Sequence, residues 1–260
     1  MTFTRVSKRI GILACCLLPL AAVYTAAAAD QSGPYNVEAR WKIGGEGGWD
    51  YITVDPHAHL LYIDHGPRVD IVDTRSGKIV GGIADLKGTH GVALDDQDKY
   101  GYISDGRGDA VVVFDRHTFK TVASIPAGTN PDGIVFEPVT KTVWAFNGRS
   151  NNATVIDTKT LKVVATIALP GKPEFPVADG KGIVFDNIES KNSIERLDAK
   201  TLKLTDTWSL DGCDSPSGRA IDRAHRLLFS VCDDKKMAVT DANTGKSVAT
   251  PEIGDGPNAA

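Results

Sequence analysis

The sequence predicts an all-β protein, a β-propeller of four-stranded blades, and two observations support this fold. The first is a motif that occurs five times, in which an apolar strand is followed by an aspartate, a polar turn and a lysine. The second is that each copy lies among short β segments separated by turn residues, without sustained helical periodicity. The motif aspartates are 42, 42, 41 and 43 residues apart; they are Asp73, Asp115, Asp157, Asp198 and Asp241. Four strands in roughly 40 residues form one propeller blade.

The first 29 residues lie outside the repeats and are typical of a secretory signal. A basic N-terminal end precedes an apolar run over residues 10–23, and residues 26–29 are all alanine. The run is shorter than the roughly 20 residues that a membrane-spanning helix needs. We expect cleavage before Asp30, a periplasmic or secreted location, and no membrane span in the mature chain. An uncleaved anchor and lipidation at Cys15 are the alternatives.

The mature chain is acidic. Without the first 29 residues it carries 26 Lys and Arg against 33 Asp and Glu, a formal net charge of −7. This charge disfavours nucleic acid or an anionic membrane surface as the partner. No Cys-x-x-Cys-His haem-attachment motif is present, and no other motif indicates a cofactor.

The predicted propeller repeats span residues 38–260, after a flexible lead-in over residues 30–37. Residues 38–43 match the segments 121–125 and 163–167, each of which follows an Asp-led turn. We therefore expect residues 38–43 to be the last strand of a repeat whose first three strands are missing.

Each full repeat contains four predicted strands, here called a to d in chain order. They are 51–54, 60–64, 68–72 and 78–83 in the first repeat, 92–94, 100–104, 110–114 and 120–125 in the second, and 134–136, 143–146, 153–156 and 162–167 in the third. The fourth and fifth repeats continue the scheme, with 182–185 and 227–231 as their b strands. The motif aspartates fall between strands c and d. Aspartate there accepts hydrogen bonds from backbone N–H groups two residues on, so we predict a structural role for all five.

The last eight residues, 253–260, reproduce the link into a further a strand. Unpaired strand edges recruit other chains, and exported proteins avoid them. We therefore expect the sequence to be part of a longer protein that has at least six blades and most naturally seven.

The repeats resemble the YVTN-type β-propeller family, and most closely the periplasmic YncE-like proteins. The resemblance is carried by Gly91-Val92-Ala93-Leu94-Asp95, Tyr102-Ile103-Ser104 and Val111-Val112-Val113-Phe114-Asp115. It implies a seven-bladed propeller outside the cytoplasm that acts as a binding or scaffold protein without an agreed reaction. The chain departs from the family in lacking the final blades.

Polar residues recur in the d-to-a and b-to-c links, which emerge on one face of a propeller around its central channel. We predict a ligand-binding site there. The candidate residues are His90, Asp132, Glu174, Ser217, Asp105, Arg107, Asn147, Arg149 and Asn187.

His90, Asp132 and Glu174 occupy equivalent positions in three consecutive repeats, so we expect them to point toward a common axis. Together they are candidate ligands for a divalent metal or candidate acid–base groups. The alternative is that they are turn residues in a hydrated channel. Arg107 and Arg149 hold matching b-to-c positions and are candidates to clamp an anionic group, or else are solvated loop arginines.

Cys213 and Cys232 are the two cysteines of the mature chain. Cys213 lies in the link that enters the fifth a strand, and Cys232 ends the fifth b strand. Antiparallel neighbours bring these two ends together, so we predict a disulfide, which persists in an exported protein.

The sequence thus favours a binding or scaffold protein over an enzyme, with a small polar molecule or a protein as its partner at the channel mouth. The alternative is a metal-dependent propeller hydrolase or lyase that acts on a lactone or ester. In that case His90, Asp132 and Glu174 would hold the ion, with Asn147 or Asn187 as further ligands.

Overall fold

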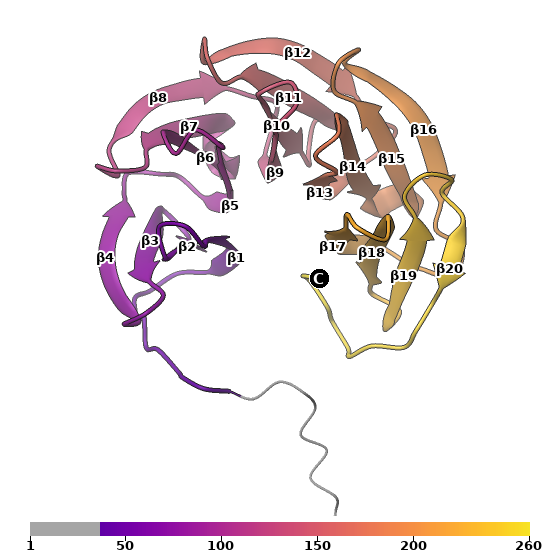
Figure 1. The fold of residues 1–260 in the computed structure, drawn as a ribbon, viewed down its shortest axis with the longest axis horizontal. Coiled ribbons are helices and arrows are strands. Elements are labelled where there is room, and N and C mark those ends of the chain that lie inside the picture. Colours follow the sequence, from indigo (N-terminus) through magenta and orange to yellow (C-terminus); the bar gives the residue numbers. More distant parts are fainter. Residues whose placement is uncertain (1–36) are drawn as a thin grey trace, which may run out of the picture. The chain divides into compact units, whose positions relative to one another are not determined.

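The computed structural model describes residues 37–260 and confirms the all-β propeller fold (Figure 1). Residues 41–260 form one compact unit of five four-stranded antiparallel sheets. The predicted signal over residues 1–29 and most of the lead-in lie outside the described residues. Among the described residues no helix is long and apolar enough to cross a membrane.

Each blade runs through its four strands in chain order. Blade 1 contains β1 (Trp49–Asp55), β2 (Leu60–His65), β3 (Arg68–Asp73) and β4 (Lys78–Ile83). Blade 2 contains β5 (Thr89–Leu94), β6 (Tyr100–Asp105), the 3₁₀ turn η1 (Gly106–Gly108), β7 (Ala110–Asp115) and β8 (Thr121–Pro126). Blade 3 contains β9 (Pro131–Glu137), β10 (Thr142–Asn147), β11 (Asn152–Asp157) and β12 (Lys162–Ala168).

The last two blades follow the same order. Blade 4 contains β13 (Pro173–Ala178), β14 (Ile183–Ile188), the 3₁₀ turn η2 (Glu189–Lys191), β15 (Ser193–Asp198) and β16 (Lys203–Ser209). Blade 5 contains β17 (Pro216–Asp222), β18 (Leu227–Cys232), β19 (Lys236–Asp241) and β20 (Ser247–Ala249). The a strands contact their successors from β1 to β17 and face the channel, while the d strands form the outside (Figure 1).

The core lies between neighbouring blades, because the two middle strands of each sheet bury both faces. Trp144 and Phe146 of blade 3 pack with Val184 and Leu197 of blade 4, and all four are fully buried. Equivalent clusters join blades 1 and 2, blades 2 and 3, and blades 4 and 5. Burial on both faces explains why strands b and c read as nearly continuous apolar runs.

The five motif aspartates form the c-to-d turns, as predicted. Asp157 accepts hydrogen bonds from the backbone N–H and the hydroxyl of Thr160, both at 2.7 Å. The other four aspartates accept from backbone N–H groups two and three residues on. In every turn one residue has a φ between 54° and 71°; the five are Gly77, Phe119, Leu161, Leu202 and Gly245.

The predicted strand over residues 38–43 is wrong, because residues 37–48 contain no hydrogen-bonded strand. The described residues supply no c strand with which it could pair. Trp41 nevertheless packs on the c-to-d turn of blade 1, where a Cβ on Gly77 would lie 2.3 Å from its ring. Trp208 of β16 makes the same contact with Gly245 of blade 5. Trp41 thus packs where a d-strand tryptophan packs in blade 5, although it does not itself lie in a strand. The expectation of further blades concerns residues outside this sequence and stays a prediction.

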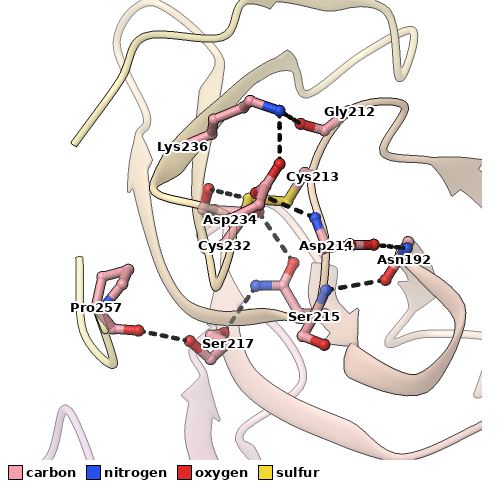
Figure 2. The surroundings of a disulfide bond; sticks show 12 residues. Asn192, Gly212, Cys213, Asp214, Ser215, Ser217, Cys232, Asp234, Lys236 and Pro257 are labelled. Atoms are coloured by element: carbon pink, nitrogen blue, oxygen red, sulfur yellow. Dashed lines mark hydrogen bonds and ion pairs between the residues drawn. A yellow bond between two sulfur atoms is a disulfide. The ribbon is translucent and has the colours of Figure 1, made fainter. Parts of the chain in front are cut away.

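The predicted disulfide between Cys213 and Cys232 is confirmed (Figure 2). The two Cα atoms are 5.3 Å apart, and both side chains are buried against the blade 4–5 core. It ties the link before β17 to the end of β18, on the face where the links gather. Closing a loop of this length contributes about 3 kcal/mol in the loop-entropy model.

Candidate functional site

A cavity of about 600 Å³, which we call the mouth, lies among the links of blades 1 to 3. Gly48, just before β1, lines the mouth together with Trp49 and Asp50, the first two residues of β1. His90, the second residue of β5, lines it as well. Arg107 and Arg149 come from the b-to-c links of blades 2 and 3. The structure therefore brings three of the predicted residues, His90, Arg107 and Arg149, to one cavity.

Three cationic side chains surround the mouth. Arg107, Arg149 and Lys87 are all exposed, and all three line the cavity. Within residues 37–260 none of them forms an ion pair or a side-chain hydrogen bond, whereas His90 and Lys172 both pair with carboxylates. Their charge is therefore available to a ligand.

His90 forms a hydrogen-bonded pair with Asp50 at the inner edge of the mouth. Its Nδ1 lies 2.7 Å from Asp50 Oδ2 and 3.8 Å from Asp132 Oδ1. Burial opposes protonation of the ring, but Asp50 and Asp132 outweigh it and raise the pKa of His90. A Cβ on Gly106 would lie 2.5 Å from His90 Nε2, so a glycine is needed beside the ring.

Carboxyl groups continue below His90 along the channel. Burial and the charge of Asp50 raise the pKa of Asp132. Glu174 lies 2.6 Å from Lys172 Nζ, yet burial and Asp132 raise its pKa to about 7. Burial raises the pKa of Asp64 to about 8, since neither of its oxygens has a hydrogen-bond partner among the described residues. At neutral pH this channel therefore holds fewer charges than its sequence indicates.

A second cavity, which we call the Arg219 cavity, has a volume of about 450 Å³ and adjoins the mouth through Trp49 and Asp50. Tyr51 and Ile52 of β1 line it together with Phe175 of β13 and Arg219 of β17. The rings of Tyr51 and Phe175 meet edge to face, with centroids 4.7 Å apart. This cavity is therefore aromatic on one wall, and Gly218, Asn258, Ala259 and Ala260 complete its lining.

Four of the predicted site residues have their polar groups turned to the protein instead. Asp105 is buried and accepts hydrogen bonds from the backbone N–H groups of Lys87 and Gly88, at 2.9 and 2.8 Å. It therefore shapes the link that carries Lys87, and it does not pair with Arg107.

The other three of these residues are Asn147, Asn187 and Ser217. Asn147 is fully buried and donates to Thr154 Oγ1 and Asn152 Oδ1. Asn187, also fully buried, donates to the Ser217 carbonyl at 2.8 Å. The Ser217 hydroxyl donates to the Pro257 carbonyl at 3.3 Å (Figure 2). Short polar side chains at strand ends satisfy nearby backbone groups before they reach the channel.

His90, Asp132 and Glu174 do not form a metal site in the described part of the chain. No group of three or more His, Cys, Asp and Glu side chains among residues 37–260 is placed to hold an ion. Lys172 Nζ lies against Glu174 and Glu189, so a cationic side chain already occupies the position beside Glu174.

Sequence reasoning missed Tyr51, Lys87, Lys172 and Arg219. For Arg219 a signal existed. The fourth residue of the a strand in blades 1 to 5 is Ile52, Val92, Ile134, Pro176 and Arg219, respectively. Only the last of these is polar, so the exception marks a buried charge.

The comparisons with known proteins support the fold alone. No protein-family model matches the sequence, and no curated protein sequence matches it. Among solved structures, hydrazine synthase of Kuenenia stuttgartiensis is similar with a TM-score of 0.63 and 17% identity, covering 86% of this chain and 92% of that chain. A structure of U3-55K and the RRP9 WD40 repeats are both similar with a TM-score of 0.72 and 10% identity. Each covers 80% of this chain, and 65% and 64% of its own chain respectively. The protein is a β-propeller.

Proposed function

We propose that this propeller is a binding protein that recognises a small organic anion at the mouth. The observation that carries the proposal is the set of three exposed cations, Lys87, Arg107 and Arg149, around a cavity of about 600 Å³ without an acidic partner among residues 37–260. Guanidinium groups bind carboxylate and phosphate oxygens through paired hydrogen bonds. The exposed face of Trp49 offers an apolar surface for the body of the ligand.

The proposal includes export and membership of the YVTN-type, YncE-like family. The composition of residues 1–29 supports export, and so does the Cys213–Cys232 disulfide, because disulfides persist in oxidising compartments. The repeat motifs at 91–95, 102–104 and 111–115 support the family.

Calorimetry with citrate and inorganic phosphate at low ionic strength tests the binding proposal. We expect wild-type protein to bind at least one of these anions and the Arg107→Gln/Arg149→Gln double variant to bind it at least tenfold more weakly. The expected loss corresponds to about 1.4 kcal/mol or more. Added salt should weaken binding, since exposed charges are screened.

Arg75→Gln is the matched control. Arg75 is an exposed arginine in the outer turn of blade 1, where it pairs with Asp73, and its loss removes one charge far from the mouth. Equal anion affinity in the double variant and wild type would refute the proposal. Failure of the wild-type protein to bind both citrate and phosphate would refute it too.

The metal-dependent hydrolase or lyase gains no support from the arrangement of His90, Asp132 and Glu174. The pairing of His90 with Asp50 orients an imidazole as a general base would need, but no nucleophile lies in hydrogen-bond contact with it among the described residues. We therefore favour binding over catalysis.

A further inference from the structure

The imidazole ring of His90 has one nitrogen bound to the protein and one open to the mouth. Its Nδ1 lies 2.7 Å from Asp50 Oδ2. Its Nε2 has no hydrogen-bond partner among residues 37–260, and it is not buried, unlike the unpaired Nε2 of His65. Because His90 lines the mouth, this open nitrogen is available to a ligand there.

The absence of a side chain at Gly106 leaves space beside that nitrogen. A Cβ on Gly106 would lie 2.5 Å from His90 Nε2 and 3.1 Å from Asn130 Oδ1. Asn130 also lines the mouth, and its amide forms no hydrogen bond within the described part of the chain. An amide can present either its oxygen or its NH₂ group to a ligand. The space is therefore bordered by two polar side chains whose hydrogen-bonding capacity is unused, which suits a ligand oxygen.

Asp50 determines what the open nitrogen can do. A carboxylate beside Nδ1 keeps a proton on that nitrogen, so Nε2 carries a proton only when the ring is cationic. Nε2 accepts a hydrogen bond in the neutral ring and donates one in the cationic ring. An anion in the mouth can therefore pair only with the cationic ring.

The charged groups around His90 are mostly acidic. Asp132 Oδ1 of β9 lies 3.8 Å from Nδ1, and Asp64 of β2 also acts on the ring. Although burial opposes protonation, Asp50, Asp132 and Asp64 together raise the pKa of His90. The other charged side chains on the adjoining links and strands are Lys87, Asp105 and Arg107, and Asp105 accepts hydrogen bonds from backbone N–H groups.

We propose that His90 is a further contact of the anion bound at the mouth, through the Nε2–H of its cationic ring, and that Asp50 is the positioning residue that holds the ring. This inference rests on the proposed function. Anion binding and protonation of His90 are then linked, so anion affinity falls as rising pH removes the proton. Linkage is reciprocal, so a bound anion must make His90 harder to deprotonate.

Sulfate is the probe, because it stays a dianion between pH 5.5 and pH 8.5 and its own charge does not change. Histidine ring signals of the full chain are titrated by NMR with and without saturating sulfate, and His90→Gln identifies the His90 signal. We expect sulfate to raise the pKa of His90. The pKa of His117, an exposed histidine in the outer turn of blade 2, should not change. A His90 pKa that is the same in saturating sulfate overturns the proposal, and this measurement does not depend on the folding of a variant.

Calorimetry of sulfate binding at pH 5.5 and pH 8.5 gives the second test. Wild type should bind at least fivefold more tightly at pH 5.5. Channel acids that ionise as pH rises contribute to this ratio with the same sign, so the informative comparison is with His90→Gln. That variant should reduce the ratio at least threefold, and His117→Gln should keep it. An equal ratio in wild type and His90→Gln overturns the proposal.

Asp50→Asn tests the positioning role. Asparagine still offers Nδ1 an acceptor oxygen but removes the charge, so the pKa of His90 should fall and the loss of sulfate affinity should move to lower pH. Removal of an acid from the mouth without this role would strengthen sulfate binding and leave the pH of that loss in place, which would overturn the role of Asp50.

The outcomes separate this proposal from the proposed function. If sulfate binding depends on Arg107 and Arg149 but leaves the pKa of His90 unchanged, the His90 contact is refuted and the anion site stands. If wild type does not bind sulfate at pH 5.5, the His90 contact is refuted as well, and citrate and phosphate decide the proposed function.

Discussion

The outer turns and the central channel use the same acidic residues in opposite ways. In the turns, Asp157 and its four equivalents accept side-chain and backbone hydrogen bonds in solvent, and these bonds lower their pKa values. In the channel, Asp64, Glu174 and Asp186 are buried, and burial raises their pKa values. The aspartate that recurs in every outer turn is structural, whereas the buried acids Asp64, Glu174 and Asp186 stand at three different positions of their blades.

The difference follows from the number of donors that each carboxylate meets. Asp157 accepts two hydrogen bonds of 2.7 Å from Thr160, which favour the charged form. Asp64 is fully buried and has no hydrogen-bond partner within 3.5 Å among the described residues, so Thr89 and His90 offset only part of the hydration that its charged form loses. The two regions should therefore respond to pH with opposite sign.

The largest effect on the free energy of unfolding is expected from Asp64→Asn, which replaces the buried carboxyl group with an uncharged group of the same shape. The pKa of Asp64 is about 8 in the folded protein, above the ordinary value of 3.8. A raised folded-state pKa gives stability that is complete below pH 4 and is lost as pH rises through 8. Each pKa unit is worth ~1.4 kcal/mol, so the variant should gain several kcal/mol over wild type at pH 8.5.

Urea unfolding at pH 5 and pH 8.5 measures this gain, with Asp157→Asn as the matched outer-turn control. Asp64→Asn should flatten the decline in unfolding free energy between the two pH values, and the control should leave it in place. An unchanged decline in Asp64→Asn would show that Asp64 is charged in the folded state, and the contrast between the regions would fail.

The next largest effect on the free energy of unfolding is expected where two a strands approach each other closely. A Cβ on Gly133 of β9 would lie 2.2 Å from the Glu174 carbonyl oxygen of β13, so Gly133→Ala must displace a channel strand. Overpacking of this kind costs about 1–3 kcal/mol in unfolding free energy. The displacement should also alter the surroundings of Glu174.

Gly148→Ala, in the b-to-c link of the same blade, is the control for Gly133→Ala. The nearest atom to its added Cβ is 3.5 Å away, an ordinary contact. Thermal unfolding should show a lowered melting temperature for Gly133→Ala alone. Equal melting temperatures in the two variants would mean that the channel strands have more room than the structure indicates.

The sequence predicted the repeating parts of the molecule better than the parts that differ between blades. The motif aspartates located every c-to-d turn, and the repeat register placed Cys213 beside Cys232. Asp105 and Asn147 looked equivalent to Arg107 and Arg149 in the links, but their short side chains hydrogen-bond within the protein while the long arginines reach the mouth.

Residues 38–43 show the same limit. Their pattern matches a d strand, and Trp41 does pack as Trp208 does, but a strand also needs a hydrogen-bonding neighbour, which a local pattern cannot supply. Asp50 and His90 are 40 residues apart, and only the packing of β1 beside β5 brings them together.

The smallest effect is expected from Asp157→Ala in the outer turn of blade 3. The variant loses the two hydrogen bonds from Thr160, and because solvent replaces them the cost should be about 1 kcal/mol. The pKa of Asp157 is lowered in the folded protein, so its contribution is present above pH 4 and is lost as pH falls through the folded-state pKa. The difference in unfolding free energy between wild type and Asp157→Ala should therefore shrink from pH 6 to pH 3, opposite in direction to the Asp64 effect. A difference that grows on acidification would place Asp157 with the channel acids and remove the distinction between the outer-turn aspartates and the buried carboxyl groups.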